Sequence, residues 1–238
     1  MHRHFDEELK LLKERLLTMG SLAERMLHRA VEALVTHDGA TLPEVFSIEK
    51  EVNELEVQIE QDVLSLIARR QPVAADLRFL VMAIKIAGEV ERCGDQAVNI
   101  AQTTQRLVSE LPIKRLVMPP ILAQKALKML REALDAFVRG DANLARRVLA
   151  EDDEVDSLRD DVFRTMITYM MEDPTTISRA LSLVLIARNL ERVADHATNI
   201  AEEVIFLVEA REVRSEQEKG ARFQPNTTPA ARPEENRA

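Results

Sequence analysis

Apolar residues recur along the chain with spacings that alternate between four and three residues, which is the a/d heptad pattern of packed amphipathic helices. Three such runs occupy 5–30, 48–66 and 83–107. Glycine and proline interrupt the pattern within 38–43, and Pro72 ends the second run. The first part of the chain is therefore predicted to form three long helices joined by short turns.

The same pattern begins again in the second part of the chain, after a linker that Pro119 and Pro120 are predicted to mark. Residues 133–141 align with 30–38, an offset of 103 residues, and the residues around position 191 align with those around position 91 at an offset of 100. Each half therefore has the plan of one antiparallel three-helix bundle. We predict an all-α fold of two tandem three-helix bundles with six long helices.

Domain boundaries follow from these repeats. The first bundle is predicted to cover residues 1–111 and the second 112–212. Residues 213–238 form a polar tail with three prolines and almost no large apolar side chains. Such a segment cannot bury enough surface to offset its ordering entropy, so we expect this tail to be disordered.

An acidic motif occurs once in each half and is the most informative feature of the sequence. Glu91, Asp95 and Asn99 are spaced by four residues, and positions 191, 195 and 199 carry the same residue types. At about 100° per residue these positions form one stripe on a helix, directed away from the apolar seam. Like charges one turn apart are unfavourable by about 0.2–0.5 kcal/mol. A bound cation would offset this cost, because hard cations and iron bind carboxylate oxygens.

The second helix of each half supplies oxygen ligands at the same spacing, Glu49 with Asn53 and Asp152 with Asp156. If this helix packs beside the third helix, both flanks face one site. Because Asn53 is uncharged, the first site is expected to bind metal more weakly than the second. A solvated charged face is the alternative interpretation. The candidate metal ligands are Glu49, Asn53, Glu91, Asp95, Asn99, Asp152, Asp156, Glu191, Asp195 and Asn199.

Composition narrows the class of protein. Only 6 Gly, 7 Phe, 1 Tyr and no Trp in 238 residues disfavour a β-sandwich or barrel. The formal net charge of −9 argues against a nucleic-acid binder held by phosphate contacts. Cys93 is the single cysteine, so no intrachain disulfide is possible, and no apolar stretch has the ~18–20 residues of a membrane span. We expect a cytoplasmic protein that does not cross the membrane.

Four segments resemble the PhoU family of phosphate-transport accessory proteins. They are Arg70-Gln71-Pro72-Val73-Ala74-Ala75-Asp76-Leu77-Arg78, Glu91-Arg92-x-x-Asp95, Tyr169-Met170-Met171-Glu172-Asp173 and Glu191-Arg192-x-x-Asp195. The resemblance covers nearly all of residues 5–210. It implies two symmetric three-helix bundles, a homodimer, and multinuclear metal sites at the acidic motifs, with iron or zinc bound and magnesium as a further candidate.

The resemblance also implies a regulatory role without catalysis. Members of the family link the high-affinity phosphate ABC transporter to a sensor histidine kinase, repress the phosphate-starvation response when phosphate is plentiful, and restrain uptake. The implied partners are the ATPase subunit of the transporter and the kinase, and only these partners would bring the protein to the membrane. Arg69, Arg70, Asp76 and Arg78 flank the Pro72 turn and are candidate partner-binding residues, with ordinary helix ending and capping as the alternative.

Two other functions compete with this prediction. A carboxylate-bridged metal enzyme would need a partly enclosed metal with an open coordination position, which an outward-facing stripe disfavours. A purely structural coiled coil is disfavoured by the proline breaks. Cys93 is expected to be a buried structural thiol, and His196 is expected on the exposed side, solvated rather than bound to metal.

Overall fold

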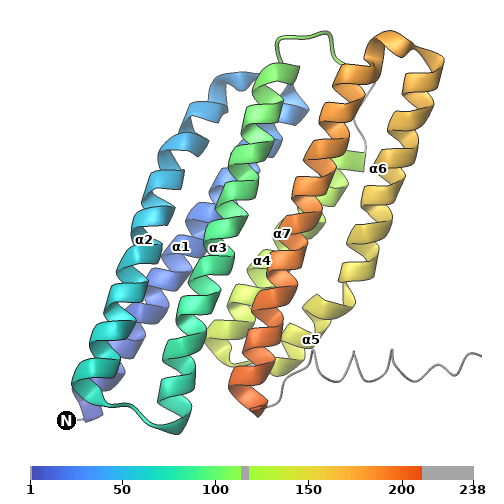
Figure 1. Cartoon of the computed structure of the whole chain (residues 1–238). Coiled ribbons are helices and arrows are strands. Elements are labelled where there is room, and N and C mark those ends of the chain that lie inside the picture. Colours follow the sequence, from blue (N-terminus) through green and yellow to red (C-terminus); the bar gives the residue numbers. More distant parts are fainter. Residues whose placement is uncertain (1, 114–117, 211–238) are drawn as a thin grey trace, which may run out of the picture.

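The computed structural model describes residues 2–113 and 118–210, and every regular element in these ranges is a helix (Figure 1). The first half contains α1 (His2–Thr36), the short 3-10 helix η1 (Gly39–Thr41), α2 (Leu42–Arg70) and α3 (Ala74–Leu107). The second half contains α4 (Met118–Arg139), α5 (Ala142–Ala150), α6 (Asp152–Glu172), the 3-10 helix η2 (Pro174–Thr176) and α7 (Ile177–Glu209).

The predicted all-α fold is confirmed, with α5 and α6 together taking the place of one middle helix. The predicted disordered tail, residues 213–238, lies outside the described residues.

Local sequence signals explain where the helices begin and end. The Asp38 carboxylate accepts a hydrogen bond from the backbone N–H of Ala40 at 3.0 Å and so starts η1. Asp141 caps α5 in the same way, with two backbone N–H groups of the first turn at 3.0 Å. Gly140, which follows the last residue of α4, has φ +62°, a left-handed conformation that glycine adopts without steric cost.

Pro119 and Pro120 do not mark the linker that the sequence predicted. Helix α4 begins at Met118, so both prolines lie in its first turn. Proline has no N–H group, but the first N–H groups of a helix lack an intrahelical acceptor, and the fixed φ of proline suits a helix start. The prediction was wrong because a proline pair is as compatible with a helix N-terminus as with a loop.

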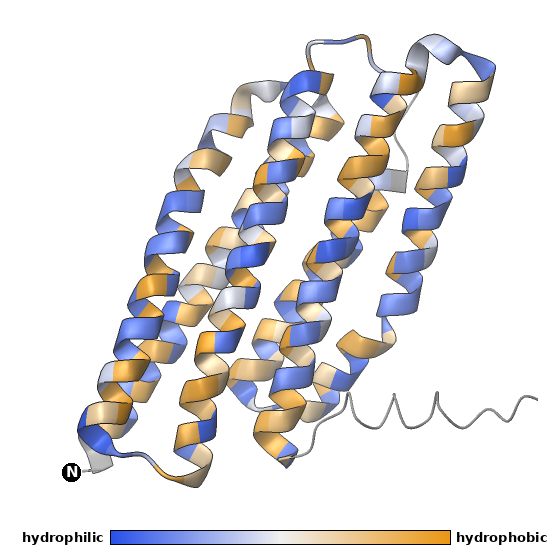
Figure 2. Cartoon of the chain, viewed as in Figure 1, coloured by the Kyte–Doolittle hydropathy of each residue, from blue (hydrophilic) through white to orange (hydrophobic). Residues whose placement is uncertain are grey.

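The heptad seams form one continuous buried core. In α1 the seam is buried from Leu12 to Ala30, while Phe5 and Leu9 nearer the N-terminus are only half-buried. Each helix carries a hydrophobic and a hydrophilic stripe (Figure 2). In α3 every predicted seam position is buried, namely Ala83, Ile86, Val90, Cys93, Ala97, Ile100, Thr104 and Leu107.

Helices α3 and α7 pack against each other at the centre of the molecule, and α1 packs on α4 behind them (Figure 1). The pairing of α3 with α7 is antiparallel, since Lys85 binds Glu203 at 2.8 Å whereas Glu89 binds His196 at 2.8 Å. The two helices that carry the acidic motifs are therefore the two that join the halves.

The middle helix differs between the halves. Helix α2 is continuous, whereas its counterpart is divided at Glu151, whose backbone N–H donates to the carbonyl of Val148 at 3.1 Å. That bond spans three residues, as in a 3-10 turn, and ends α5. The Glu151 carboxylate binds Lys128 of α4 at 2.6 Å and Lys125 at 3.1 Å, which fixes the bend against α4.

Candidate functional site

Each acidic motif lies on a central helix, beside the middle helix of its own half, because α2 packs on α3 and α6 packs on α7. Asp95 and Asp195 are exposed, as the predicted outward stripe requires. Glu91 and Glu191 lie deeper and are half-buried, with only 18% of the Glu191 side chain exposed. The motifs therefore start at the edge of the core and run out to the surface.

In the first half, four acidic residues and one asparagine on α2 and α3 are called here the first cluster: Glu49, Asn53, Glu56, Glu91 and Asp95. Burial raises the pKa of Glu91, and the charges of Asp95 and Glu56 raise it further. None of the four carboxylates makes an ion pair with a lysine or arginine in the part of the chain that the structure describes. The first cluster is thus a set of oxygen ligands without a paired cation.

Glu56 was not among the residues predicted from the sequence. It lies three residues after Asn53 on α2, a spacing that places two side chains on the same flank of a helix. A Cβ atom on Gly88 of α3 would lie 3.8 Å from Oε1 of Glu56, so the Glu56 side chain reaches α3. The i, i+3 spacing from Asn53 was the signal that could have identified it.

In the second half, Asp152, Asp156, Arg159, Glu191 and Asp195 form the second cluster. Burial raises the pKa of Asp195, and the charges of Glu191 and Asp152 raise it further. The predicted convergence of the two helix flanks is therefore present. Nη1 of Arg159, however, lies 2.8 Å from Oε1 of Glu191 and 3.2 Å from Oδ1 of Asp156.

Arg159 and Glu191 also line a cavity of about 390 Å³ between α6 and α7. A second arginine, Arg188, lines the same cavity together with Phe163 and Val184. The second cluster is therefore a mixed site of carboxylates, guanidinium groups and apolar side chains.

The two clusters differ in how well they fit a metal ion. Within residues 2–113 and 118–210, no three His, Cys, Asp or Glu side chains converge closely enough to hold one. The first cluster fits a hard cation in its chemistry, because its donors are oxygens and none of its carboxylates forms an ion pair with lysine or arginine within the described residues. The second cluster does not fit, because a guanidinium already binds two of the predicted ligands.

His196 and Asn199 take part in the contact between the halves. Nδ1 of His196 lies 2.8 Å from Oε2 of Glu89 on α3, and the Asn199 amide donates to the same oxygen at 3.0 Å. Although burial alone would raise the pKa of Glu89, these two hydrogen bonds lower it. The prediction of an exposed, solvated His196 was wrong, since only 15% of its side chain is exposed. The equivalent Asn99 is exposed.

Cys93 is fully buried, and burial raises the pKa of its thiol. The expectation of a buried cysteine is therefore confirmed. A thiol held in the protonated form in an apolar core is a poor nucleophile and metal ligand.

The Pro72 turn gathers three of the four predicted partner-binding residues. Arg69, Arg70 and Asp76 line a shallow pocket of about 270 Å³ with Phe5. Nε of Arg70 donates to Oε2 of Glu8 on α1 at 3.0 Å, so this arginine fastens the turn to the N-terminal helix. The fourth residue, Arg78, is half-buried and lies outside this pocket.

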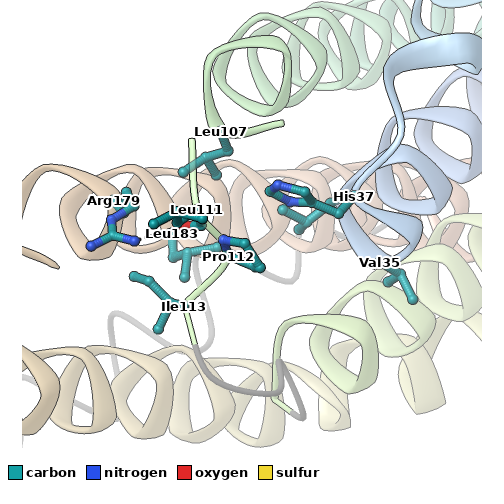
Figure 3. Close-up of a pocket in the computed structure, with 9 residues that line it drawn as sticks. Val35, His37, Leu107, Leu111, Pro112, Ile113, Arg179 and Leu183 are labelled. Atoms are coloured by element: carbon teal, nitrogen blue, oxygen red, sulfur yellow. Dashed lines mark hydrogen bonds between the residues drawn. The ribbon is translucent and has the colours of Figure 1, made fainter. Parts of the chain in front are cut away.

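A further cavity, of about 380 Å³, lies where the connection between the halves leaves α3, and it was not predicted from the sequence (Figure 3). Its two basic side chains are both engaged with that connection. Nη1 of Arg179 donates to the carbonyl of Leu111 at 2.6 Å, and Nε2 of His37 lies 3.0 Å from the carbonyl of Glu110. The lining residues are Leu34, Val35, His37, Leu107, Leu111, Pro112, Ile113, Arg179 and Leu183.

Large apolar side chains are exposed on α6 and α7 in the second half. They recur every four residues on both helices, so each set forms a row on one face. We call this surface the apolar face, and its residues are Phe163, Ile167, Met171, Ile177, Leu181 and Leu185, each between 39% and 79% exposed. No helix in the described ranges is both long enough and apolar enough to span a membrane.

Comparison with known proteins assigns the chain. The PhoU domain model matches it twice, at residues 16–104 and 120–204. The chain belongs to the PhoU family. A PhoU homologue from Pseudomonas aeruginosa is 40% identical over 213 residues, which are 89% of this chain and 88% of that protein. PhoU of Escherichia coli K12 is 35% identical over 210 residues, 88% and 87% of the two chains. Both are named phosphate-specific transport system accessory proteins.

Two PhoU crystal structures share the fold. PhoU from Pseudomonas aeruginosa superposes with a TM-score of 0.82 at 40% identity, covering 87% of this chain and all of that chain. The phosphate transport system regulatory protein PhoU from Streptococcus pneumoniae gives 0.79 at 26% identity, covering 88% and 99%. All residues of the two clusters lie within the two stretches that the PhoU domain model matches.

Proposed function

We propose that this protein is a non-catalytic accessory regulator of a phosphate-specific transport system. The observation that carries the proposal is the double PhoU domain match, together with relatives of that name at 35–40% identity along almost the whole chain. Regulation needs surfaces rather than an enclosed reaction site. Both acidic clusters reach the solvent through Asp95 and Asp195, which favours a binding role over catalysis.

The proposed partners are the ATPase subunit of a phosphate ABC transporter and a sensor histidine kinase. The protein would act in the cytoplasm as a homodimer, reach the membrane through these partners, and repress both phosphate uptake and the phosphate-starvation response. The apolar face supports a protein partner, because exposed apolar patches on a protein surface mark interaction sites. The Pro72 turn, with Arg69 and Arg70, is a second candidate surface.

Metal binding is proposed as part of this function. Glu49, Asn53, Glu56, Glu91 and Asp95 would supply the oxygen ligands in the first cluster. An ion there would remove the repulsion between carboxylates of α2 and α3 and so fasten the two helices together. Iron, zinc or magnesium are the candidate ions, and a multinuclear site is proposed because the ligands are spread over several helical turns.

Deleting the gene tests the regulatory role. In phosphate-rich medium the deletion strain should express phosphate-starvation genes and take up phosphate faster than the parent, and the wild-type gene should reverse both effects. Unchanged expression of these genes in the deletion strain would rule out the proposed repression.

Complementation with surface variants tests the partner site. Ile167→Glu, in the middle of the apolar face, should fail to restore repression although the variant protein remains folded by circular dichroism. Leu64→Glu is the matched control, because Leu64 is the counterpart of Ile167 on α2 and is 56% exposed. Equal complementation by both variants would exclude the apolar face as the partner site.

A further inference from the structure

The two clusters occupy equivalent places in the repeat but carry different charges. The offset of 103 residues that aligns Glu49 with Asp152 and Asn53 with Asp156 also aligns Glu56 with Arg159. The first cluster therefore has four carboxylates and no base, whereas the second has four carboxylates and a guanidinium. This difference reverses the expectation, based on Asn53 alone, that the first site is the weaker one.

Arg159 is held in place by three carboxylates. Its guanidinium lies 2.8 Å from Glu191, 3.2 Å from Asp156 and 3.0 Å from Asp160, and only 33% of the side chain is exposed. The contact with Glu191 joins α6 to α7. Glu191 and Asp156 are the carboxylates that a metal ion bridging these two helices would need, so the guanidinium occupies the position of such an ion.

A guanidinium cannot make room by losing its proton, because arginine stays charged at any physiological pH. A metal ion entering the second cluster would have to break the bonds of Arg159 to Glu191 and Asp156 and then remain beside a displaced positive charge. Arg188, which lines the same cavity, adds a second positive charge close to that position. Glycine stands at the equivalent position 88 in the first half, beside Glu56.

We propose that Arg159 is a built-in counter-ion that excludes metal ions from the second cluster, so that this chain binds metal at the first cluster alone. The inference rests on the proposed metal binding of the first cluster, but its central claim concerns Arg159 and can be tested separately. The two halves then differ in what holds their outer helices together. The arginine permanently links α6 to α7, whereas an exchangeable metal ion links α2 to α3.

Binding of Mn²⁺ to the metal-stripped full-length protein provides the test, with free Mn²⁺ measured by electron paramagnetic resonance. Asp95→Asn should weaken binding by at least about tenfold, the usual scale for losing a group at a metal site. Asp195→Asn should change it less than twofold. Arg159→Glu should add a second set of bound Mn²⁺, which Asp195→Asn in the same chain should remove.

Arg164→Glu is the matched control, because Arg164 lies on α6 and pairs with Asp161, away from the cluster. It should leave Mn²⁺ binding unchanged. Arg159→Gln, which removes the charge with a smaller change of shape, guards against misfolding of Arg159→Glu, and its thermal midpoint should rise with Mn²⁺ more than that of wild type.

The outcomes separate the two proposals. No gain of Mn²⁺ binding in either Arg159 variant would overturn the role of Arg159, as would an equal loss in Asp95→Asn and Asp195→Asn. If the wild type binds no Mn²⁺ while Arg159→Glu does, metal binding by the first cluster fails and the exclusion by Arg159 stands.

Discussion

The two halves of the molecule share many of their buried residues but differ where the middle and last helices meet the solvent. Equivalent buried pairs are Ile86 and Ile186, Ala87 and Ala187, Ala97 and Ala197, Ile100 and Ile200, and Ala101 and Ala201, each at most 1% exposed. Equivalent pairs on the outer face are Glu56 and Arg159, Glu60 and Phe163, Lys85 and Leu185, and Gly88 and Arg188.

The difference shows which positions the fold constrains. A close-packed interior tolerates only small changes in volume, so equivalent core positions keep the same or similar apolar side chains, as Val90 and Leu190 do. Residues on the outer face are not constrained in this way. In the first half they are mainly acidic, and in the second half they are apolar residues and arginines. We therefore assign metal binding to the acidic first cluster in the first half, and partner binding through the apolar face to the second half.

The largest expected loss of stability comes from truncating a core side chain, and it should be the same in both halves. Ile100→Ala and Ile200→Ala each remove a fully buried side chain from equivalent places, and each should lower the free energy of unfolding by about 3 kcal/mol. Chemical denaturation followed by circular dichroism measures both. Losses that differ by more than about 1 kcal/mol would contradict an equivalent core in the two halves.

The next effect concerns the contact that joins the halves. Glu89→Ala leaves His196 and Asn199 without their partner and should cost about 2 kcal/mol at pH 7. Lys85→Ala, which removes an exposed ion pair with Glu203 in the same interface, should cost less than about 0.5 kcal/mol.

The loss caused by Glu89→Ala should depend on pH in a defined direction. Because the folded state lowers the pKa of Glu89 below its ordinary value of 4.5, the stabilisation is complete above that value and is lost as the pH falls through the lowered pKa. A cost that stayed the same when Glu89 is protonated would show that charge plays no part in the contact.

The helices and the core were predictable because short stretches of sequence determine them. A heptad seam identifies the buried face of each helix without reference to its neighbours, and the prolines and Asp38-Gly39 indicate the breaks. The start of α4 was misplaced because Pro119 and Pro120 suit both a loop and a first helical turn.

The site was predictable only in part, because its chemistry depends on which helices touch. The acidic motifs and their convergence with the middle helix followed from spacing. The partner of His196 did not, since Glu89 lies 107 residues away and the packing of α3 on α7 leaves no mark on either helix alone. Arg159 was not predicted, because acidic motifs point to oxygen ligands and not to a basic partner, although its i, i+3 spacing from Asp156 is visible in the sequence.

Removing the charge of the motif glutamate should change the stability of the protein by a smaller amount, and in opposite directions in the two clusters. Glu191→Gln weakens the hydrogen bond from Arg159 and should destabilise the protein by about 1 kcal/mol in a chelator-containing buffer at pH 7. Glu91→Gln relieves repulsion in the first cluster and should stabilise it by about 0.3 kcal/mol, a value reduced for solvent screening at this partly exposed site.

The gain from Glu91→Gln should disappear in acid. Because the folded state raises the pKa of Glu91 above its ordinary value of 4.5, the penalty of its charge is complete above the raised pKa and disappears as the pH falls below 4.5, where Glu91 is protonated in both the folded and the unfolded state. Denaturation curves at pH 7 and pH 4 measure the difference. Effects of the same sign in Glu91→Gln and Glu191→Gln would contradict the difference in charge between the clusters.

The last contrast concerns the ends of the middle helices. Gln71, the C-cap residue that follows α2, has φ +48°, whereas Asp173, the C-cap residue that follows α6, has an extended φ of −144°. A Cβ is strained in the left-handed conformation, so Gln71→Gly should stabilise the protein by about 0.5 kcal/mol after the entropic cost of glycine in the unfolded chain. Asp173→Gly should instead destabilise it, because the carboxylate that binds Thr175 at 2.7 Å and 3.0 Å is lost. Thermal unfolding of both variants measures the contrast, and a loss of stability in Gln71→Gly would mean that the Gln71 side chain contributes more at this turn than its backbone strain costs.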